Sequence, residues 1–147
     1  MAPPLMALCV VLVASTSIAA APPPLNRALE LRLLRVDPSP PVKLAKTRFH
    51  GYRIVAGPVR ADARTRELFA RTMTTGYSVP WPTKYCAFSP VYGASFLLGE
   101  RHIDVLMCPG CDETQYYDGA RWIRTADFGA VKLKLVPIYD RLFVHNK

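Results

Sequence analysis

The chain has 147 residues, of which half are hydrophobic and a fifth are charged, and its formal net charge at pH 7 is +8. This hydrophobic content excludes a chain that is disordered throughout, and the length supports one domain with its own core rather than two. The charge is uneven along the chain. Residues 22–76 contain 11 basic and 4 acidic side chains, whereas residues 77–147 contain 8 and 7.

Residues 1–20 have the features of a signal peptide. They carry no charged side chain, they include an apolar run over residues 5–13, and they end in small residues. This pattern predicts cleavage near Ala19 or Ala20 and export to the periplasm or the medium. The basic residues usual at the start of a leader are missing, so an uncleaved N-terminal anchor is the alternative.

Residues 21–48 are expected to form a proline-rich, partly helical arm in front of a single domain at residues 49–147. Apolar residues recur at helical spacing over residues 25–36, which predicts a helix there. The prolines at positions 38, 40 and 41 would end it, because proline cannot continue a helix and restricts the residue before it.

The first elements expected in the domain are a strand and a helix. Residues 52–56 (YRIVA) read as a strand, and Asp62 is a suitable N-cap for a helix that runs to about Thr75 and stops at Gly76. The apolar face of this helix is expected to pack on a sheet.

Three arginines, Arg64, Arg66 and Arg71, lie on the opposite face of the predicted helix. A basic face of this kind is typical either of a solvated helix or of a surface that meets anionic partners. We expect the solvated face, with contact to anionic surfaces as the alternative, and no specific nucleic-acid binding.

Two hairpins are predicted in the second half of the chain. Residues 91–98 and 102–107 are runs of strand formers around a glycine-containing turn, and residues 114–117 and 121–125 repeat the pattern around Asp-Gly-Ala. In the second run, residues 103, 105 and 107 should share one face of the sheet and residues 104, 106 and 108 the other.

Residues 128–136 alternate in polarity (VKLKLV) and predict a further strand, after which Pro137 would open a short amphipathic segment through Phe143. The expected fold is therefore α+β, an antiparallel β-meander of three to five strands packed against one main helix.

Three cysteines remain after removal of the leader: Cys86, Cys108 and Cys111. An odd number in an oxidising compartment predicts one disulfide and one further thiol. If the first hairpin turns at Glu100, Cys86 lies closer along the ladder to Cys111 than to Cys108. The predicted order is therefore Cys86–Cys111 first, Cys86–Cys108 second and Cys108–Cys111 third.

The Cys108-x-x-Cys111 pair also raises thiol-disulfide exchange as an alternative. Redox motifs of this spacing sit at a helix N-terminus in a βαβ unit, whereas the residues after Cys111 are hairpin-like. A zinc site would need a fourth ligand, and His102 lies about 20 Å from Cys108 along a strand. His50 or Asp112 could serve only if the fold brought them in.

The remaining polar residues give no catalytic, cofactor-binding or metal-binding set. The three histidines are scattered along the chain, no serine lies in a nucleophile-elbow motif, and no phosphate-binding glycine loop is present. No cofactor is predicted.

One longer pattern resembles a known family. A start of the form C-x-F-x-P is followed by D-x-x-x-C-x-x-C, and the matching residues are Cys86, Phe88, Pro90, Gly93, Asp104, Cys108 and Cys111. This pattern is similar to that of a family of uncharacterised bacterial exported proteins, over roughly residues 49–143. The sequence departs from it at residues 91–93, where Val-Tyr-Gly stands in place of Arg-His-Gly. The resemblance implies a fold-level grouping and no activity.

The sequence thus predicts a secreted or periplasmic domain, stabilised by a disulfide, that is a non-catalytic binding or envelope-associated module. Its partner would be a protein or another envelope component. The alternative is a thiol-disulfide oxidoreductase or a metal-binding protein that uses Cys86, Cys108 and Cys111.

Overall fold

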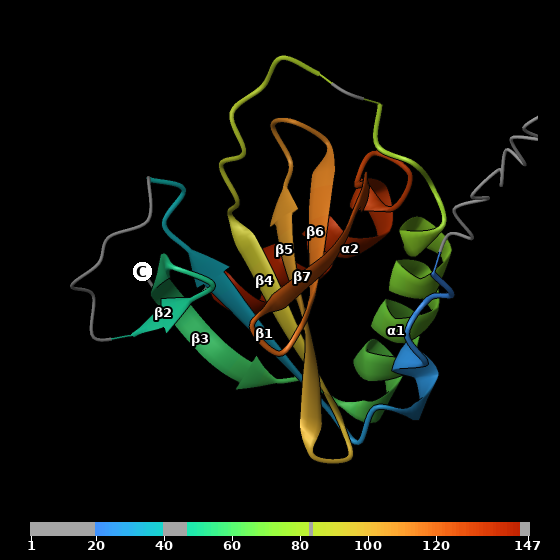
Figure 1. The fold of residues 1–147 in the computed structure, drawn as a ribbon. Helices are drawn as coiled ribbons and strands as arrows, with labels where there is room; N and C mark the ends of the chain where they lie inside the picture. Colours follow the sequence, from blue (N-terminus) through green and yellow to red (C-terminus); the bar gives the residue numbers. More distant parts are fainter. Residues whose placement is uncertain (1–19, 40–46, 83, 145–147) are drawn as a thin grey trace, which may run out of the picture.

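A curled, fully antiparallel sheet dominates the computed structural model, which describes residues 20–39, 47–82 and 84–144 (Figure 1). Within these residues the sheet has seven strands in the order β2-β3-β1-β4-β5-β6-β7. The strands are β1 (Glu30–Val36), β2 (Arg48–Phe49), β3 (Tyr52–Arg60), β4 (Tyr92–Leu98), β5 (Arg101–Cys108), β6 (Glu113–Asp118) and β7 (Arg121–Asp127). The predicted leader, apart from its last residue, lies outside the described residues.

Two helices, α1 (Ala63–Tyr77) and α2 (Lys132–Phe143), pack on one face of the sheet, and a short 3-10 helix, η1 (Leu25–Arg27), precedes β1 (Figure 1). Phe69 of α1 and Tyr139 of α2 are fully buried against each other and the strands, with ring centroids 5.8 Å apart. The Tyr139 hydroxyl donates a hydrogen bond to the carbonyl of Gly93 at 2.7 Å. The main core therefore lies between the helices and the sheet, and the α+β class is confirmed.

Helix α1 begins where the sequence predicts. The Asp62 carboxylate accepts a hydrogen bond from the backbone N–H of Thr65 at 2.7 Å, which satisfies one of the free donors of the first turn. The helix continues to Tyr77, past the glycine expected to stop it. A Cβ on Gly76 would lie 3.0 Å from Val131 Cγ1, so this glycine instead allows close packing against the segment that leads into α2.

Both predicted hairpins are confirmed. Leu98 pairs with Arg101 around a two-residue turn in which Gly99 has a φ of +63°, a conformation that glycine adopts without steric cost. The β6–β7 hairpin turns in the same way. Residues 103, 105 and 107 of β5 are buried in the main core, and residues 104, 106 and 108 face the other side of the sheet.

The predicted helix at residues 25–36 is wrong, because Glu30–Val36 forms β1 between β3 and β4. Leu31 and Leu33 are buried against the helices, while Leu34 and Val36 are buried on the opposite face. A strand that is buried on both faces has apolar residues on both sides, so the two-residue alternation typical of a strand is lost from its sequence. The spacing of its apolar residues can then match that of a helix. The segment expected to be an arm supplies a central strand of the sheet.

The strand predicted at residues 128–136 is also wrong, since Lys132–Phe143 is α2 and Pro137 lies inside it. Leu135, Ile138 and Tyr139 are buried at helical spacing, whereas Leu133 is 88% exposed. Over six residues the alternation of VKLKLV fits both a strand and a helix. Only the spacing of the apolar residues that follow distinguishes the two. Within the described residues the sheet therefore has seven strands rather than three to five, with two α-helices rather than one.

Candidate functional site

The cysteines follow the first of the predicted pairings. Cys86 and Cys111 form a disulfide with a Cα–Cα distance of 5.9 Å, and Cys108 is a free, buried thiol. The β4–β5 ladder ends near Met107, and the turn that follows carries Cys111 back toward the segment before β4. The Trp81 indole N–H donates to the Cys111 carbonyl at 3.2 Å and holds the same turn. The two cysteines of the C-x-x-C motif are therefore not paired with each other.

The ligands considered for a metal site do not converge. Among residues 20–39, 47–82 and 84–144, no group of three or more His, Cys, Asp or Glu side chains could hold a metal ion. Asp112 is bound instead by the Lys132 ammonium at 2.9 Å and by Lys84 at 3.5 Å. Its hydrogen bond with Lys132 is the main cause that lowers the pKa of Asp112.

Four polar residues that the sequence leaves scattered meet on the side of the sheet opposite the helices. We call His50, Ser95, His102 and Asp104 the polar chain. Asp104 accepts hydrogen bonds on its two oxygens, from Ser95 Oγ at 2.6 Å and from His50 Nε2 at 2.8 Å. His102 Nδ1 lies 3.1 Å from Ser95 Oγ. The register of β4 and β5 places Ser95 opposite Asp104, and this pairing across strands is the signal that sequence spacing alone does not reveal.

His50 reaches Asp104 from the tip of the β2–β3 hairpin. His50 and Gly51 form its two-residue turn, with φ values of +48° and +90°, as a type I′ turn requires. The imidazole stacks on the Tyr117 ring at a centroid distance of 3.9 Å. Only 11% of the His50 side chain and 14% of the Asp104 side chain are exposed. The hairpin is thereby fastened to the sheet.

Beneath this hairpin lies a second, smaller apolar cluster. It consists of Leu34, Val36 and Leu106, with Phe49, Tyr52, Ile54, Phe88 and Tyr117 packed against it. The polar chain borders this cluster. Its hydrogen bonds hold the hairpin in place and shield the cluster from water.

The polar chain does not have the geometry of a nucleophilic triad. In such a triad the carboxylate orients the histidine that deprotonates the serine, whereas Asp104 here binds Ser95 directly. Ser95 also lies in the middle of β4, where strands pair on both sides and the backbone N–H groups are used in the ladders. No backbone donors are left there to stabilise an oxyanion.

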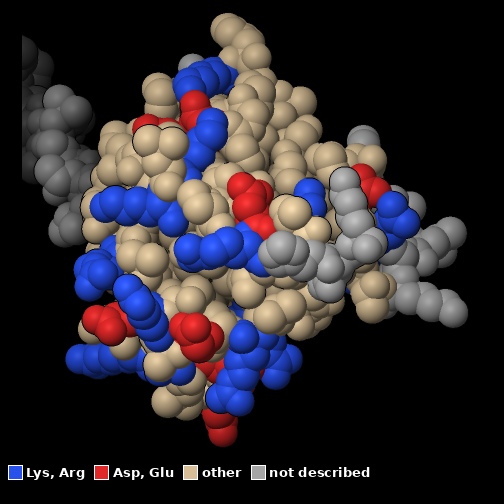
Figure 2. Space-filling view, turned by 180° about the vertical axis from the view of Figure 1, so that it is seen from behind, with Lys and Arg blue, Asp and Glu red and all other residues tan. Residues whose placement is uncertain are grey.

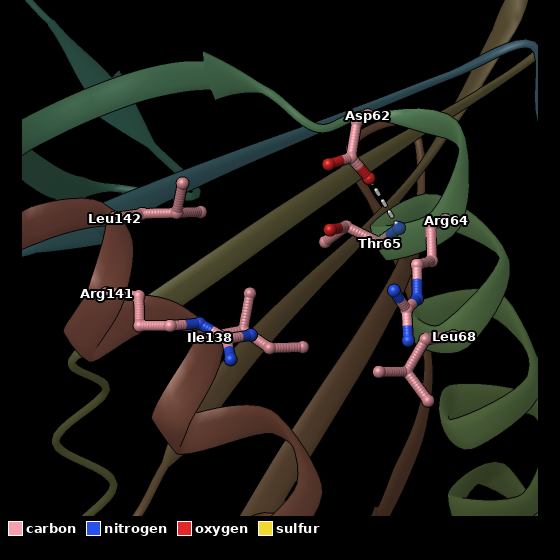
Figure 3. Close-up of a pocket in the computed structure, with 7 residues that line it drawn as sticks. All are labelled: Asp62, Arg64, Thr65, Leu68, Ile138, Arg141 and Leu142. Carbon is pink, nitrogen blue, oxygen red and sulfur yellow. Dashed lines mark hydrogen bonds between the residues drawn. The ribbon is translucent and has the colours of Figure 1, made fainter.

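A cleft lies between the start of α1 and the end of α2 (Figure 3). Its volume is about 530 Å³. The residues that line it are Asp62, Arg64, Thr65 and Leu68 from the start of α1, with Ile138, Arg141 and Leu142 from the end of α2. Arg141 extends from α2 toward α1, and Arg64 lies along α1 toward Leu68 (Figure 3).

The charges of this cleft are unbalanced. Neither Arg64 nor Arg141 forms a salt bridge with a carboxylate of the described part of the chain. Asp62 is engaged as the helix cap, and its hydrogen bond from the Thr65 N–H is the main cause that lowers its pKa. The cleft therefore holds two guanidinium groups and one carboxylate.

The other arginines of the predicted basic face are occupied. Arg66 Nη1 donates to the Leu29 carbonyl at 3.0 Å, and Arg71 lies 3.7 Å from Glu67 one turn away. Figure 2 shows basic and acidic side chains interleaved over the face that carries the helices. Of the three predicted arginines, Arg64 alone lines the cleft.

Comparison of the chain with family models, with curated proteins and with solved structures gives no match. No helix within residues 20–39, 47–82 and 84–144 is both long and apolar enough to span a bilayer. In the described part of the chain, the fold and the site define a curled antiparallel half-barrel with two α-helices, the Cys86–Cys111 disulfide and a basic cleft between the helices.

Proposed function

We propose that this protein is an exported binding module without catalytic activity, and that its ligand binds in the cleft between α1 and α2. Export is supported by the leader-like features of residues 1–20 and by the resemblance to exported proteins. The Cys86–Cys111 disulfide supports the same location, because such bonds persist in oxidising compartments.

The observation that carries the binding site is a pair of arginines, neither of them in a salt bridge with a described carboxylate, at a cleft with an apolar wall. A volume of about 530 Å³ lies within the usual range of small-molecule sites. A charged side chain without a partner stays hydrated, and it is free to bind a ligand without first breaking an ion pair. Leu68, Ile138 and Leu142 supply the apolar wall that such sites need.

The cysteines weigh against the redox alternative. An active dithiol needs two nearby thiols, one of them exposed and of low pKa, commonly at a helix N-terminus. Cys111 is bonded to Cys86, Cys108 is buried, and the motif spans the turn between β5 and β6. The Cys86–Cys111 disulfide joins the segment before β4 to the turn between β5 and β6.

Native mass spectrometry of protein purified from the exported fraction tests the proposal. We expect a bound small molecule in the wild type, its loss in Leu68→Trp, which fills the cleft, and its retention in Leu133→Trp. Leu133 is the matched control, because it lies on α2 but is 88% exposed and outside the cleft. Equal binding by all three proteins would contradict the site. Insulin reduction that disappears in Cys108→Ser would contradict the absence of catalysis.

A further inference from the structure

We infer that the cleft between α1 and α2 binds an amphiphile with a single negative charge, namely an acyl chain that ends in a carboxylate. The inference rests on the proposed function of this cleft and specifies its ligand. It depends on three features of the lining: the number of charges, the position of the arginines and the apolar wall.

The charges match a monoanion. Arg64 and Arg141 contribute two positive charges and Asp62 one negative charge, so the lining has a net charge of +1. The two guanidinium groups come from different helices on opposite sides of the cleft (Figure 3). A carboxylate in the cleft would meet a guanidinium group from each helix, and planar guanidinium donors fit the two oxygens of a carboxylate closely.

Asp62 sets the limit on ligand charge. Its carboxylate accepts a hydrogen bond from the N–H of Thr65 at 2.7 Å, which orients it at the start of α1. The Thr65 N–H at the start of α1 is already bound by the Asp62 carboxylate. An incoming anion therefore meets the arginines rather than the N-terminus of the helix. A second negative charge on the ligand would be repelled by Asp62, and a cationic ligand would be repelled by both arginines.

The apolar wall accounts for the acyl chain. Ile138 is only 4% exposed and forms part of the main core, while Leu68 and Leu142 are half-buried at the sides of the cleft. Side chains of this type can cover a flexible hydrocarbon chain without hydrogen bonds. Each methylene removed from water there should tighten binding by about fourfold.

Calorimetric titration of the full mature protein with ten-carbon ligands, below their micellar concentrations, tests the inference. The probes are decanoate, decanol, decyl phosphate and decyltrimethylammonium. We expect decanoate to bind at least about tenfold more tightly than each of the others, and octanoate to bind more weakly by up to about 15-fold. Decanol that binds as tightly as decanoate would overturn the inference.

Variants locate the headgroup. Arg64→Gln and Arg141→Gln should each weaken decanoate binding by about tenfold, because each removes one charge-assisted hydrogen bond. Arg71→Gln is the matched control on α1, since its partner is Glu67 and it lies outside the cleft. Equal effects of all three substitutions, or none, would refute the carboxylate clamp.

The outcomes separate this inference from the proposed function. The inference would be contradicted, and the cleft would remain a binding site, if decanoate did not bind but a different small molecule co-purified and was lost in Leu68→Trp. If no molecule co-purified and decanoate did not bind, both the inference and the proposed function would be contradicted.

Discussion

Removal of the Cys86–Cys111 disulfide should lower the free energy of unfolding by about 3.5 kcal/mol. The two cysteines are 25 positions apart in the sequence. In the chain-entropy model a loop of this size costs the unfolded chain about 12 cal/mol/K, which is about 3.5 kcal/mol at 25 °C. This is a large share of the stability of a domain this small, so the reduced protein should unfold at a much lower urea concentration.

Urea unfolding of a Cys86→Ala, Cys111→Ala double variant measures this difference, with Cys108→Ala as the matched control. The control keeps the bridge and loses one buried sulfur, so its stability should fall by only about 1 kcal/mol. Peptide mapping without reductant should find Cys86 joined to Cys111 in the control. The reasoning is refuted if reduction leaves the urea midpoint of the wild type unchanged, or if mapping finds a Cys108–Cys111 bond.

Three further predictions concern other parts of the fold. Gly93→Ala should destabilise the protein by about 1–3 kcal/mol in urea unfolding, because the added Cβ would lie 2.7 Å from a leucine side chain of β1. Gly110→Ala is the control and should have little effect, because no atom lies within 4 Å of the Cβ that it adds. A double-mutant cycle on His50→Ala and Asp104→Ala should give a coupling of about 1–2 kcal/mol, and additive effects would contradict a contact that fastens the hairpin. The pKa of Asp37 is lowered from 3.8 to about 2, mainly because the backbone N–H two residues later stabilises its carboxylate. The contribution of this carboxylate to stability is therefore present above about pH 4 and lost as the pH falls toward 2. Asp37→Asn should accordingly reduce the fall in melting temperature between pH 4 and pH 2. An unchanged fall would show that the carboxylate contributes nothing.

Local patterns predict the hairpins and α1 because each depends on a few neighbouring residues, and the disulfide is predicted from the first hairpin. Asp62 caps a helix through its own carboxylate, and Gly99 permits a turn through its own φ. The disulfide follows because the β4–β5 register fixes which cysteine lies near Cys86. None of these inferences requires knowledge of a distant element.

The errors and the missed residues depend on distant contacts. β1 is recognisable as a strand only once β3 and β4 lie on either side of it, because its apolar residues serve two faces. The polar chain requires the β2–β3 hairpin to place His50 above Asp104, 54 positions away. Arg64 and Arg141 belong to helices that meet only in the folded protein, and α2 itself reads as a strand. The cleft therefore could not be predicted from the sequence.

The most direct test of the binding site is to map it by NMR on the isotope-labelled mature protein. Backbone amide shifts recorded during titration with decanoate report which residues meet the ligand. The largest shifts should fall at the start of α1 and the end of α2, around Leu68 and Ile138, and they should disappear in Leu68→Trp. Shifts centred instead on the polar chain at Asp104, or spread evenly over the surface, would contradict a ligand site between the helices.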